Sequence, residues 1–270
     1  MALCAVILAA GEGRRLRPLT DAVPKALCPV GNVPLLERAL TAVAALGIDD
    51  VAVNAWYHAD QIVDFVGDRA HLSVETGPAP LGSAGGLGLL RDWIAGRDVL
   101  VGNADAYLSG GSVAPLLSGW DRKSVRLLGV PANGRPAEFG MHRFAGFSLL
   151  PWHRVANLEA VPTDLVRSVW RPAEADDELE VVDYDGTYID SGTPADYLAA
   201  NMHALGAAPT LIDRSAVVTG SVTRAVIGAR AQVNGYAHDA VVWPDAVVAA
   251  GEQVVRAIRY GRSAADTIYV

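Results

Sequence analysis

The chain is short of cysteine, and it lacks the long apolar run of a membrane-spanning helix. Its 270 residues include only Cys4 and Cys28, which is too few for a disulfide framework, so we expect two buried, reduced thiols. The scattered histidines show no metal-ligand spacing, which argues against a zinc site. No apolar run reaches the ~20 residues that a membrane span requires. The first one has no basic residues before it, unlike a signal peptide. We therefore expect a cytoplasmic protein without a membrane partner.

Positive charge is also scarce. The sequence has 22 Lys and Arg against 30 Asp and Glu, a net charge of −8, which argues against a nucleic-acid partner because such binding needs a broad basic face. Hydrophobic residues make up 51%, enough for a substantial core. An anionic substrate would therefore need a local cationic site. Three arginines and a lysine between residues 14 and 25 are such a group.

Apolar segments alternate between strand and helix patterns over the first 110 residues. Residues 2–10 form a continuous apolar run typical of a strand covered on both faces. Residues 32–47 have helical spacing, with Asn32 as the expected N-cap and Gly47 past the end. The alternation predicts an α/β fold with a mostly parallel sheet, in which ligands bind at the carboxyl ends of the strands. The glycine-rich stretch from Gly11 follows one such end, and Asp105 follows another.

After residue 209 the sequence texture changes to short Ala- and Val-rich segments. The segments SAVVTG, DAVVWP and DAVVAA begin at 215, 239 and 245, which are multiples of six apart. IGARAQ and VNGYAH keep the same frame. A hexapeptide repeat with three short faces per coil is typical of a left-handed parallel β-helix. Residues 210–262 then supply about three coils, packed on the first domain or on another subunit.

The stretch LAAGEGRRLRPLTDAVPKALCPV, residues 8–30, is suited to binding phosphate, because glycines let backbone N–H groups approach an anion. A dinucleotide fold would need a glycine where Leu16 stands, and no Walker G-K-[ST] is present. A third pattern, G-x-G-x-R-L-x-P-L-T followed by P-K-x-L-x-P-V, matches from Gly11 to Val30. On these residues the chain resembles the sugar-1-phosphate nucleotidyltransferase family, which makes nucleoside-diphosphate sugars.

Four further blocks carry the resemblance, which spans roughly residues 3–205: PLGSAGGL at 80–87, LVGNAD at 100–105, FAGFSLLP at 144–151 and YIDSGTPADYLAAN at 188–201. It implies a Rossmann-like, mostly parallel sheet of the nucleotidyltransferase (GT-A-like) type. We expect a catalytic domain over 1–208, the β-helix over 209–262 and a tail over 263–270. A hexapeptide tail recurs in several branches of this family, and a homo-oligomer, a dimer or larger, is expected.

The resemblance also implies a chemistry and a set of site residues. A sugar 1-phosphate would attack the α-phosphorus of a nucleoside triphosphate and release pyrophosphate, with Mg²⁺ as cofactor. The implied roles are catalysis for Arg15 and Lys25; nucleotide binding for Ala9, Ala10, Gly11, Gly13, Gly82 and Ser83; the sugar-phosphate side for Asn103, Gly140 and Gly146; and metal binding for Asp105 and Asp190. For Gly82, Ser83, Asn103, Gly140 and Gly146 a purely structural role is the alternative, since glycines also serve turns and bulges.

The substrates are left open by mixed signals. Many family members have a V-E-K-P-like segment whose lysine binds the sugar phosphate, and here His142 and Arg143 are the only cations in that stretch. This shorter layout resembles the N-acetylmuramate-1-phosphate uridylyltransferases, whereas PLGSAGGL is closer to the mannose- and heptose-1-phosphate guanylyltransferases. GTP with mannose 1-phosphate is the leading expectation, and UTP with an amino-sugar 1-phosphate is the alternative. A catalytically silent sensor of nucleotide sugars is the alternative from another class.

Overall fold

A computed structural model describes residues 2–270 and divides them into two compact units. The first contains residues up to Glu12, Ala22–Leu27 and Leu35–Tyr188. The second contains Gly13–Asp21, Cys28–Pro34 and Ile189–Val270. The predicted division at 208/209 stays a prediction.

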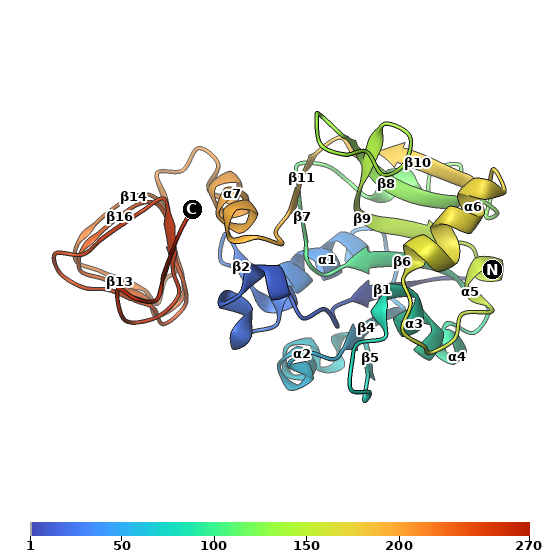
Figure 1. The fold of residues 1–270 in the computed structure, drawn as a ribbon, viewed down its shortest axis with the longest axis horizontal. Helices are drawn as coiled ribbons and strands as arrows, with labels where there is room; N and C mark the ends of the chain where they lie inside the picture. Colours follow the sequence, from blue (N-terminus) through green and yellow to red (C-terminus); the bar gives the residue numbers. More distant parts are fainter. Residues whose placement is uncertain (1) are drawn as a thin grey trace. The chain divides into compact units, whose positions relative to one another are not determined.

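The first unit is built on a seven-stranded sheet with the order β10-β8-β9-β6-β1-β4-β5 (Figure 1). All neighbouring strands are parallel except that β9 runs antiparallel to β6 and β8. The mostly parallel α/β sheet predicted from the sequence is therefore confirmed. Its strands are β1 (Leu3–Leu8), β4 (Val51–Ala55), β5 (His71–Val74), β6 (Asp98–Asn103), β8 (Val125–Pro131), β9 (His142–Leu150) and β10 (Leu179–Asp183). The short β7 (Ala106–Ser109) follows β6, and β11 (Thr187–Asp190) follows β10.

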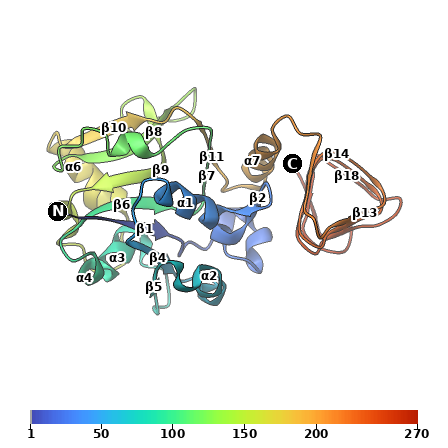
Figure 2. The same cartoon turned by 180° about the vertical axis from the view of Figure 1, so that it is seen from behind.

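Helices cover both faces of this sheet, as Figures 1 and 2 show from opposite sides. Within β1, Ala5 and Ile7 point into one core, and Cys4 and Val6 point into the other, because successive side chains of a strand alternate. The helices α1 (Leu35–Ala44) and α2 (Ala59–Val66) pack on the first core, and α3 (Gly82–Leu89), α4 (Arg91–Ile94), α5 (Trp152–Val155) and α6 (Arg171–Ala175) pack on the second. A strand buried on both faces explains the continuous apolar run in the sequence.

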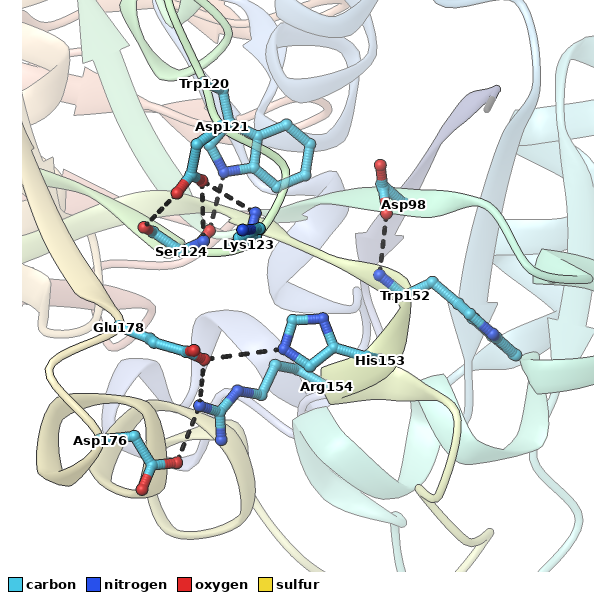
Figure 3. Close-up of polar contacts among 10 residues, drawn as sticks. All are labelled: Asp98, Trp120, Asp121, Lys123, Ser124, Trp152, His153, Arg154, Asp176 and Glu178. Atoms are coloured by element: carbon cyan, nitrogen blue, oxygen red, sulfur yellow. Dashed lines mark hydrogen bonds and ion pairs between the residues drawn. The ribbon is translucent and has the colours of Figure 1, made fainter.

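Polar contacts connect several segments at the end of the sheet where β6 begins (Figure 3). The backbone N–H of Trp152 donates to Asp98, the first residue of β6, at 2.8 Å. Arg154 pairs with Asp176 and Glu178 at 2.8 and 2.6 Å. This end of the sheet is opposite to the carboxyl ends of β1 and β6, so we assign these charged residues a role in stabilising the fold.

The second unit contains a stack of short parallel strands, which confirms the β-helix region. Its strands are β12 (Thr210–Ile212), β13 (Val217–Val218), β14 (Ser221–Ile227), β15 (Gln232–Val233), β16 (Tyr236–Val242), β17 (Val247–Val248), β18 (Gln253–Val255), β19 (Ala257–Arg259) and the antiparallel β20 (Thr267–Tyr269). Arg224, Asp239 and Arg256, with φ between 46 and 48°, stand at one corner of the coils. These corners bend the strands into the triangular outline of this region in Figure 1.

The coil length differs from the hexapeptide prediction. Three hexads would place equivalent residues 18 apart, but Ser221 pairs with Tyr236, 15 residues on, and Tyr236 pairs with Gln253, 17 residues on. The six-residue period is therefore wrong for these strands. The corners take single left-handed residues rather than longer turns, which shortens each coil.

The helix α7 (Pro194–Leu205) joins the β-helix to the segment 28–34 within the second unit. The buried Tyr197 donates its hydroxyl hydrogen to the carbonyl oxygen of Pro29, and Trp243 donates its indole N–H to the Tyr197 oxygen at 3.0 Å. Asn201 accepts from the backbone N–H of Gly31 at 2.9 Å. Burial raises the pKa of Tyr197 well above its ordinary value. Through these contacts α7 packs against both the β-helix and the segment 28–34.

The predicted N-cap at Asn32 is wrong. Gly31 and Asn32, with φ of 60 and 63°, form the turn between β2 (Pro29–Val30) and β3 (Val33–Pro34), and α1 begins only at Leu35. The Asn32 side chain donates instead to the carbonyl oxygen of Ile227 at 2.9 Å. A long-range contact therefore uses the side chain that local sequence assigned to a cap.

Replacing Tyr197 with Phe should destabilise the protein by about 1–3 kcal/mol, because the Trp243 N–H and the Pro29 carbonyl lose their buried partner. Urea unfolding measures this. The matched change Tyr269→Phe, at a residue that is 70% exposed, should stay within ~0.5 kcal/mol. Equal effects of the two changes would contradict the role of α7 described above.

Candidate active site

Backbone geometry opens the glycine-rich stretch directly after β1. Ala9 and Ala10 are buried, whereas Gly11 is exposed and has open space where a side chain would be. Gly13 has φ 63° and precedes the short 3-10 turn Arg14–Leu16, and Thr20 donates to its carbonyl oxygen at 2.9 Å. The chain crosses from the first unit to the second between Glu12 and Gly13. Gly11 is thus the exposed, unhindered glycine of the stretch, and Gly13 is the glycine in the left-handed conformation.

Lys25 and Asp105 come together in the first unit. The Lys25 ammonium lies 2.7 Å from Asp105 Oδ2, and the two side chains are 6% and 45% exposed. Lys25 sits in the 3-10 turn Lys25–Leu27. Asp105 follows the carboxyl end of β6, where the backbone N–H of Ala104 still bonds to Leu8 at 3.0 Å. Residues 80 apart in sequence therefore form one charged pair at the strand ends.

The burial of Lys25 makes this pair energetically significant. An ammonium taken out of water loses several kcal/mol of hydration, which only charge pairing and hydrogen bonds can offset. The half-exposed Asp105 carboxylate supplies such a partner while keeping contact with solvent. The pair thus fixes a positive charge within the fold and leaves carboxylate oxygen surface accessible.

Arg15 and Asp190 form a second pair, in the second unit. Arg15 Nη2 lies 3.4 Å from Asp190 Oδ2, with side chains 67% and 30% exposed. A pair this exposed contributes little to stability, roughly 0–1 kcal/mol. Its cation can leave the carboxylate for another anion at small cost.

Sequence reasoning missed Gly192, which lies against this second pair. A Cβ atom there would stand 2.6 Å from Arg15 Nη2 and 2.9 Å from Asp190 Oδ1. The signal was present as the Ser-Gly step between Asp190 and Thr193. Thr193 caps α7 as predicted, accepting from the Asp196 N–H at 3.2 Å.

Two buried polar residues, Asn54 and Glu75, were also missed. Asn54 Oδ1 accepts from the backbone N–H of Ala9 at 2.8 Å, and Asn54 Nδ2 donates to Glu75 at 2.8 Å. Each follows or ends an apolar strand segment, a pattern that singles out Asp105 as well. The sequence signal was therefore a polar residue at the carboxyl end of a predicted parallel strand.

The predicted base-binding residues Gly82 and Ser83 pack against the segment 159–165. Gly82 has φ 73°, and a Cβ there would stand 2.5 Å from the Thr163 carbonyl oxygen. The Ser83 hydroxyl accepts from the backbone N–H of Leu165 at 2.8 Å. Their local contacts account for glycine and serine at these positions, and nucleotide binding by them stays a prediction.

The residues predicted for the sugar-phosphate side lie on or next to β6 and β9. Asn103 ends β6, paired in register with Leu8. Gly140, with φ 57°, turns the chain between Phe139 and His142, while Gly146 has φ 84° and would bring a Cβ 2.6 Å from Ala106. The turn and the close approach explain both glycines physically, so their ligand role stays a prediction.

The two cations of this stretch have different surroundings in the first unit. His142 Nε2 lies 2.8 Å from Asp183 Oδ1, whereas the Arg143 guanidinium carbon lies 5.9 Å from the centre of the Tyr188 ring. A ring face attracts a cation without neutralising its charge. Of the two, Arg143 therefore has the charge that is more readily offered to an anion.

Each of the two pairs contains a carboxylate, the type of ligand that Mg²⁺ prefers. Among residues 2–270, no three or more His, Cys, Asp or Glu side chains gather in an arrangement that holds a metal ion. The side chains of Asp105 and Asp190 are 45% and 30% exposed. Carboxylate oxygens suit Mg²⁺, with water and phosphate oxygens completing its octahedron. The chemistry of these donors fits Mg²⁺.

Over residues 2–270, no helix is long and apolar enough to cross a membrane.

Comparison with known proteins places these features in a family. Residues 4–159 match the family model described as nucleotidyl transferase. A probable mannose-1-phosphate guanylyltransferase 1 from Oryza sativa is 29% identical over 227 residues, covering 72% of this chain and 62% of the relative. A glucose-1-phosphate thymidylyltransferase from Streptomyces griseus is 30% identical over 207 residues, covering 70% of this chain and 58% of the relative.

A shorter match is to a relative named for a third pair of substrates. An N-acetylmuramate alpha-1-phosphate uridylyltransferase from Neisseria meningitidis is 37% identical over 106 residues, 37% of this chain and 46% of the relative. The chain thus spans at most 62% of the length of these curated relatives. A crystal structure from Bacillus anthracis, described as a "Putative Glucose-1-Phosphate Thymidylyltransferase", shares the fold with a TM-score of 0.62 and 20% identity, covering 76% of this chain and 96% of that one.

The charged pair in the first unit predicts an asymmetry between two substitutions. Asp105→Asn should lower the free energy of unfolding by about 1–3 kcal/mol, because the buried Lys25 ammonium then faces a neutral amide. Lys25→Met, which removes the buried charge and keeps the shape, should change it by less than ~1 kcal/mol. Urea unfolding measures both, with Asp92→Asn, whose side chain is 96% exposed, as the control. A larger loss from Lys25→Met would refute this account.

Proposed function

The chain belongs to the nucleotidyl transferase family, and on that premise we propose that it transfers a nucleotidyl group from a nucleoside triphosphate to a sugar 1-phosphate. The products are a nucleoside-diphosphate sugar and pyrophosphate. GTP and mannose 1-phosphate are the leading substrates, supported by the loop PLGSAGGL and by relatives named mannose-1-phosphate guanylyltransferase in rice and mannose-1-phosphate guanyltransferase in Schizosaccharomyces pombe.

The Lys25–Asp105 pair carries this proposal. A buried lysine at the carboxyl ends of parallel strands is positioned before any substrate binds, so its charge needs little reorganisation when phosphates arrive. Asp105 neutralises Lys25 in the free protein. In the proposed complex, substrate phosphates would take over part of this neutralisation, and Asp105 would be one of the two residues that hold the metal.

The proposed reaction does not require covalent catalysis by the protein. An oxygen of the sugar phosphate, ionised near neutral pH, attacks the α-phosphorus, and the bond from that phosphorus to the pyrophosphate oxygen breaks. No general base and no covalent intermediate are needed, so rate enhancement comes from alignment and charge neutralisation. Lys25 stabilises charge near the α-phosphorus. Arg15, whose planar guanidinium suits phosphate oxygens, binds the triphosphate and the leaving pyrophosphate.

Mg²⁺ is the proposed cofactor, held by Asp105 and Asp190. When bound, such an ion neutralises phosphate charge and orients the reacting groups. In the free protein the two carboxylates are occupied by Lys25 and Arg15 respectively. The chain's own contribution is to keep two carboxylates and two cations in matched pairs, ready to exchange partners.

The remaining predicted residues take the two substrates. Ala9, Ala10, Gly11 and Gly13 are proposed to bind the nucleotide through the backbone, together with Gly82 and Ser83. Asn103, Gly140 and Gly146 are proposed to line the sugar-phosphate side. Arg143 is the proposed replacement for the lysine that many relatives supply from a V-E-K-P-like segment.

Two alternatives differ from this proposal in ways that an experiment can separate. A relative named N-acetylmuramate alpha-1-phosphate uridylyltransferase supports a second substrate pair, UTP with an amino-sugar 1-phosphate. A silent nucleotide-sugar sensor would be expected to lack a metal carboxylate or a loop cation, and Arg15, Lys25, Asp105 and Asp190 are all present.

A cytoplasmic location and a homo-oligomer, a dimer or larger, complete the proposal. The β-helix region has exposed aliphatic side chains, among them Val217 and Val255. Exposed apolar surface favours association between copies of a chain because contact removes it from water. Val217 and Val255 belong to different sheets of this region, so the homo-oligomer is proposed from the resemblance to the family.

Activity should respond sharply to the first-unit pair. Lys25→Ala should lower kcat more than ~100-fold, as loss of other preorganised charge contacts does, and Asp105→Asn should abolish turnover while the protein remains folded. Pyrophosphate release measures turnover, and circular dichroism checks folding. Asp92→Asn should behave as the unmodified protein. Near-normal turnover of either site variant would remove that residue from the proposed machinery.

A substrate panel tests the proposed reaction directly. The protein should release pyrophosphate with Mg²⁺ from one of the nucleoside triphosphates of G, U, T, A or C when a matching sugar 1-phosphate is present, with GTP and mannose 1-phosphate fastest. A faster reaction with UTP and an amino-sugar 1-phosphate would establish the second substrate pair. Nucleotide binding without turnover across the whole panel would favour the sensor.

A further inference from the structure

Asn54 and Glu75 form a buried hydrogen-bonded chain between two parts of the first unit. Asn54 is 2% exposed and Glu75 is 4% exposed. The Ala9 N–H donates to Asn54 Oδ1 at 2.8 Å, Asn54 Nδ2 donates to Glu75 Oε1 at 2.8 Å, and the Leu81 N–H donates to Glu75 Oε2 at 2.7 Å. The end of β1 is thereby connected to the residue before α3. We call these four groups the Asn54–Glu75 relay.

The relay occupies the neighbouring strands β1, β4 and β5, which lie side by side in the sheet (Figure 1). Asn54 belongs to β4, and Glu75 directly follows β5, where its own N–H donates to Ala55 at 2.8 Å. A buried carboxylate requires donors to replace its hydration. The side chain of Asn54 and the backbone of Leu81 supply them, so the carboxylate holds Leu81 in one place.

The donors and acceptors explain why these two residue types occur together. The Ala9 N–H needs an acceptor, and both donors to Glu75 need acceptors too. Asparagine presents one oxygen and one NH₂ group, so it can face the Ala9 N–H with the first and the carboxylate with the second. An aspartate in place of Asn54 would set two carboxylates against each other, and a glutamine in place of Glu75 would set an NH₂ group against a donor.

The helix α3 packs closely against the relay. A Cβ atom at Gly86, in α3, would stand 2.7 Å from Asn54 Nδ2 and 3.3 Å from Glu75 Oε1. The helix therefore rests its backbone directly on the pair. On the other side of the loop, the Thr163 N–H donates to the Leu81 carbonyl at 2.9 Å, so Leu81 is held at both its backbone groups.

We propose that Asn54 and Glu75 are positioning residues that set the distance between the two nucleotide-binding segments, Ala9–Gly11 and Gly82–Ser83. The inference rests on the proposed function, because those segments are proposed to bind the triphosphate and the base. Base selection through backbone groups depends on their placement to a fraction of an ångström. The relay links both segments through rigid, buried hydrogen bonds, and neither of its side chains is assigned a contact with substrate.

A complementary double substitution tests the relay. Asn54→Asp and Glu75→Gln each break one hydrogen bond of the chain, but together they restore all of it. The introduced carboxylate would accept from the Ala9 N–H and from the NH₂ group of the introduced glutamine. The oxygen of that glutamine would in turn accept from the Leu81 N–H.

Val155→Ala, a buried position on α5, is the control for general destabilisation. The two single variants, the double variant, this control and the unmodified protein are compared by nucleotide KM and kcat and by selectivity across the triphosphate panel. Amide hydrogen exchange at residues 9 and 81 reports on the link itself.

Each single substitution should raise the KM for the preferred triphosphate by at least about tenfold, with a smaller change in kcat, and should speed exchange at both amides; the double variant should return KM to within about threefold. Val155→Ala should leave KM and selectivity unchanged. Failure of the double variant to recover either KM or amide protection overturns the relay, as does unchanged selectivity in the single variants.

Failure of the proposed function gives a different result. An unmodified protein that neither binds nor turns over any triphosphate would refute the nucleotidyl transfer proposal, and with it the relay's role in base selection. Loss and recovery of amide protection in the variants would in that case still establish the hydrogen-bonded link itself. Protection that is unchanged in the single variants would show that no such link holds the two segments.

Discussion

Buried polar groups at the carboxyl ends of a parallel sheet must be paired, and this constraint organises the first unit. The sheet is covered on both faces, so water does not solvate groups that point inward. Lys25 is paired with Asp105, and Glu75 is bonded to Asn54 and to the Leu81 N–H. The polar residues that nucleotidyl transfer would use in this unit, or that would position its binding segments, are therefore each held by an ion pair or by hydrogen bonds.

The ion pair described in the second unit is exposed, unlike the pair of the buried Lys25 in the first. Arg15 and Asp190 pair at an exposed position where water screens them, so Arg15 can exchange this carboxylate for another anion at small cost. Its setting is nevertheless tied to the tail: the capped helix α7 begins just after Asp190 and packs through Tyr197 and Asn201 on segment 28–34 and on the β-helix. In the proposed reaction, the buried Lys25 and the exchangeable Arg15 would neutralise phosphate charge in two different ways.

Local patterns in the sequence were reliable wherever the determining forces act over a few residues. The apolar run of β1, the capped helix starting at Thr193 and the alternation that makes a parallel sheet were all predictable. The six-residue period of the tail and the cap at Asn32 were wrong. The cap was overturned by a contact distant in sequence, the bond from Asn32 to Ile227. The coil length follows the single left-handed residues at the corners, which the six-residue pattern does not reveal.

The sequence by itself determined the α/β class, the β-helix region and the residue types of the glycine-rich stretch that suit the proposed chemistry, because periodicity and side-chain chemistry are local properties. Only the tertiary structure decided that Lys25 is buried against Asp105, that Arg15 meets Asp190, and that Asn54 and Glu75 connect Ala9 to Leu81. Those pairings join residues up to 175 positions apart. They arise when chain segments pack and desolvate each other, which no local pattern records.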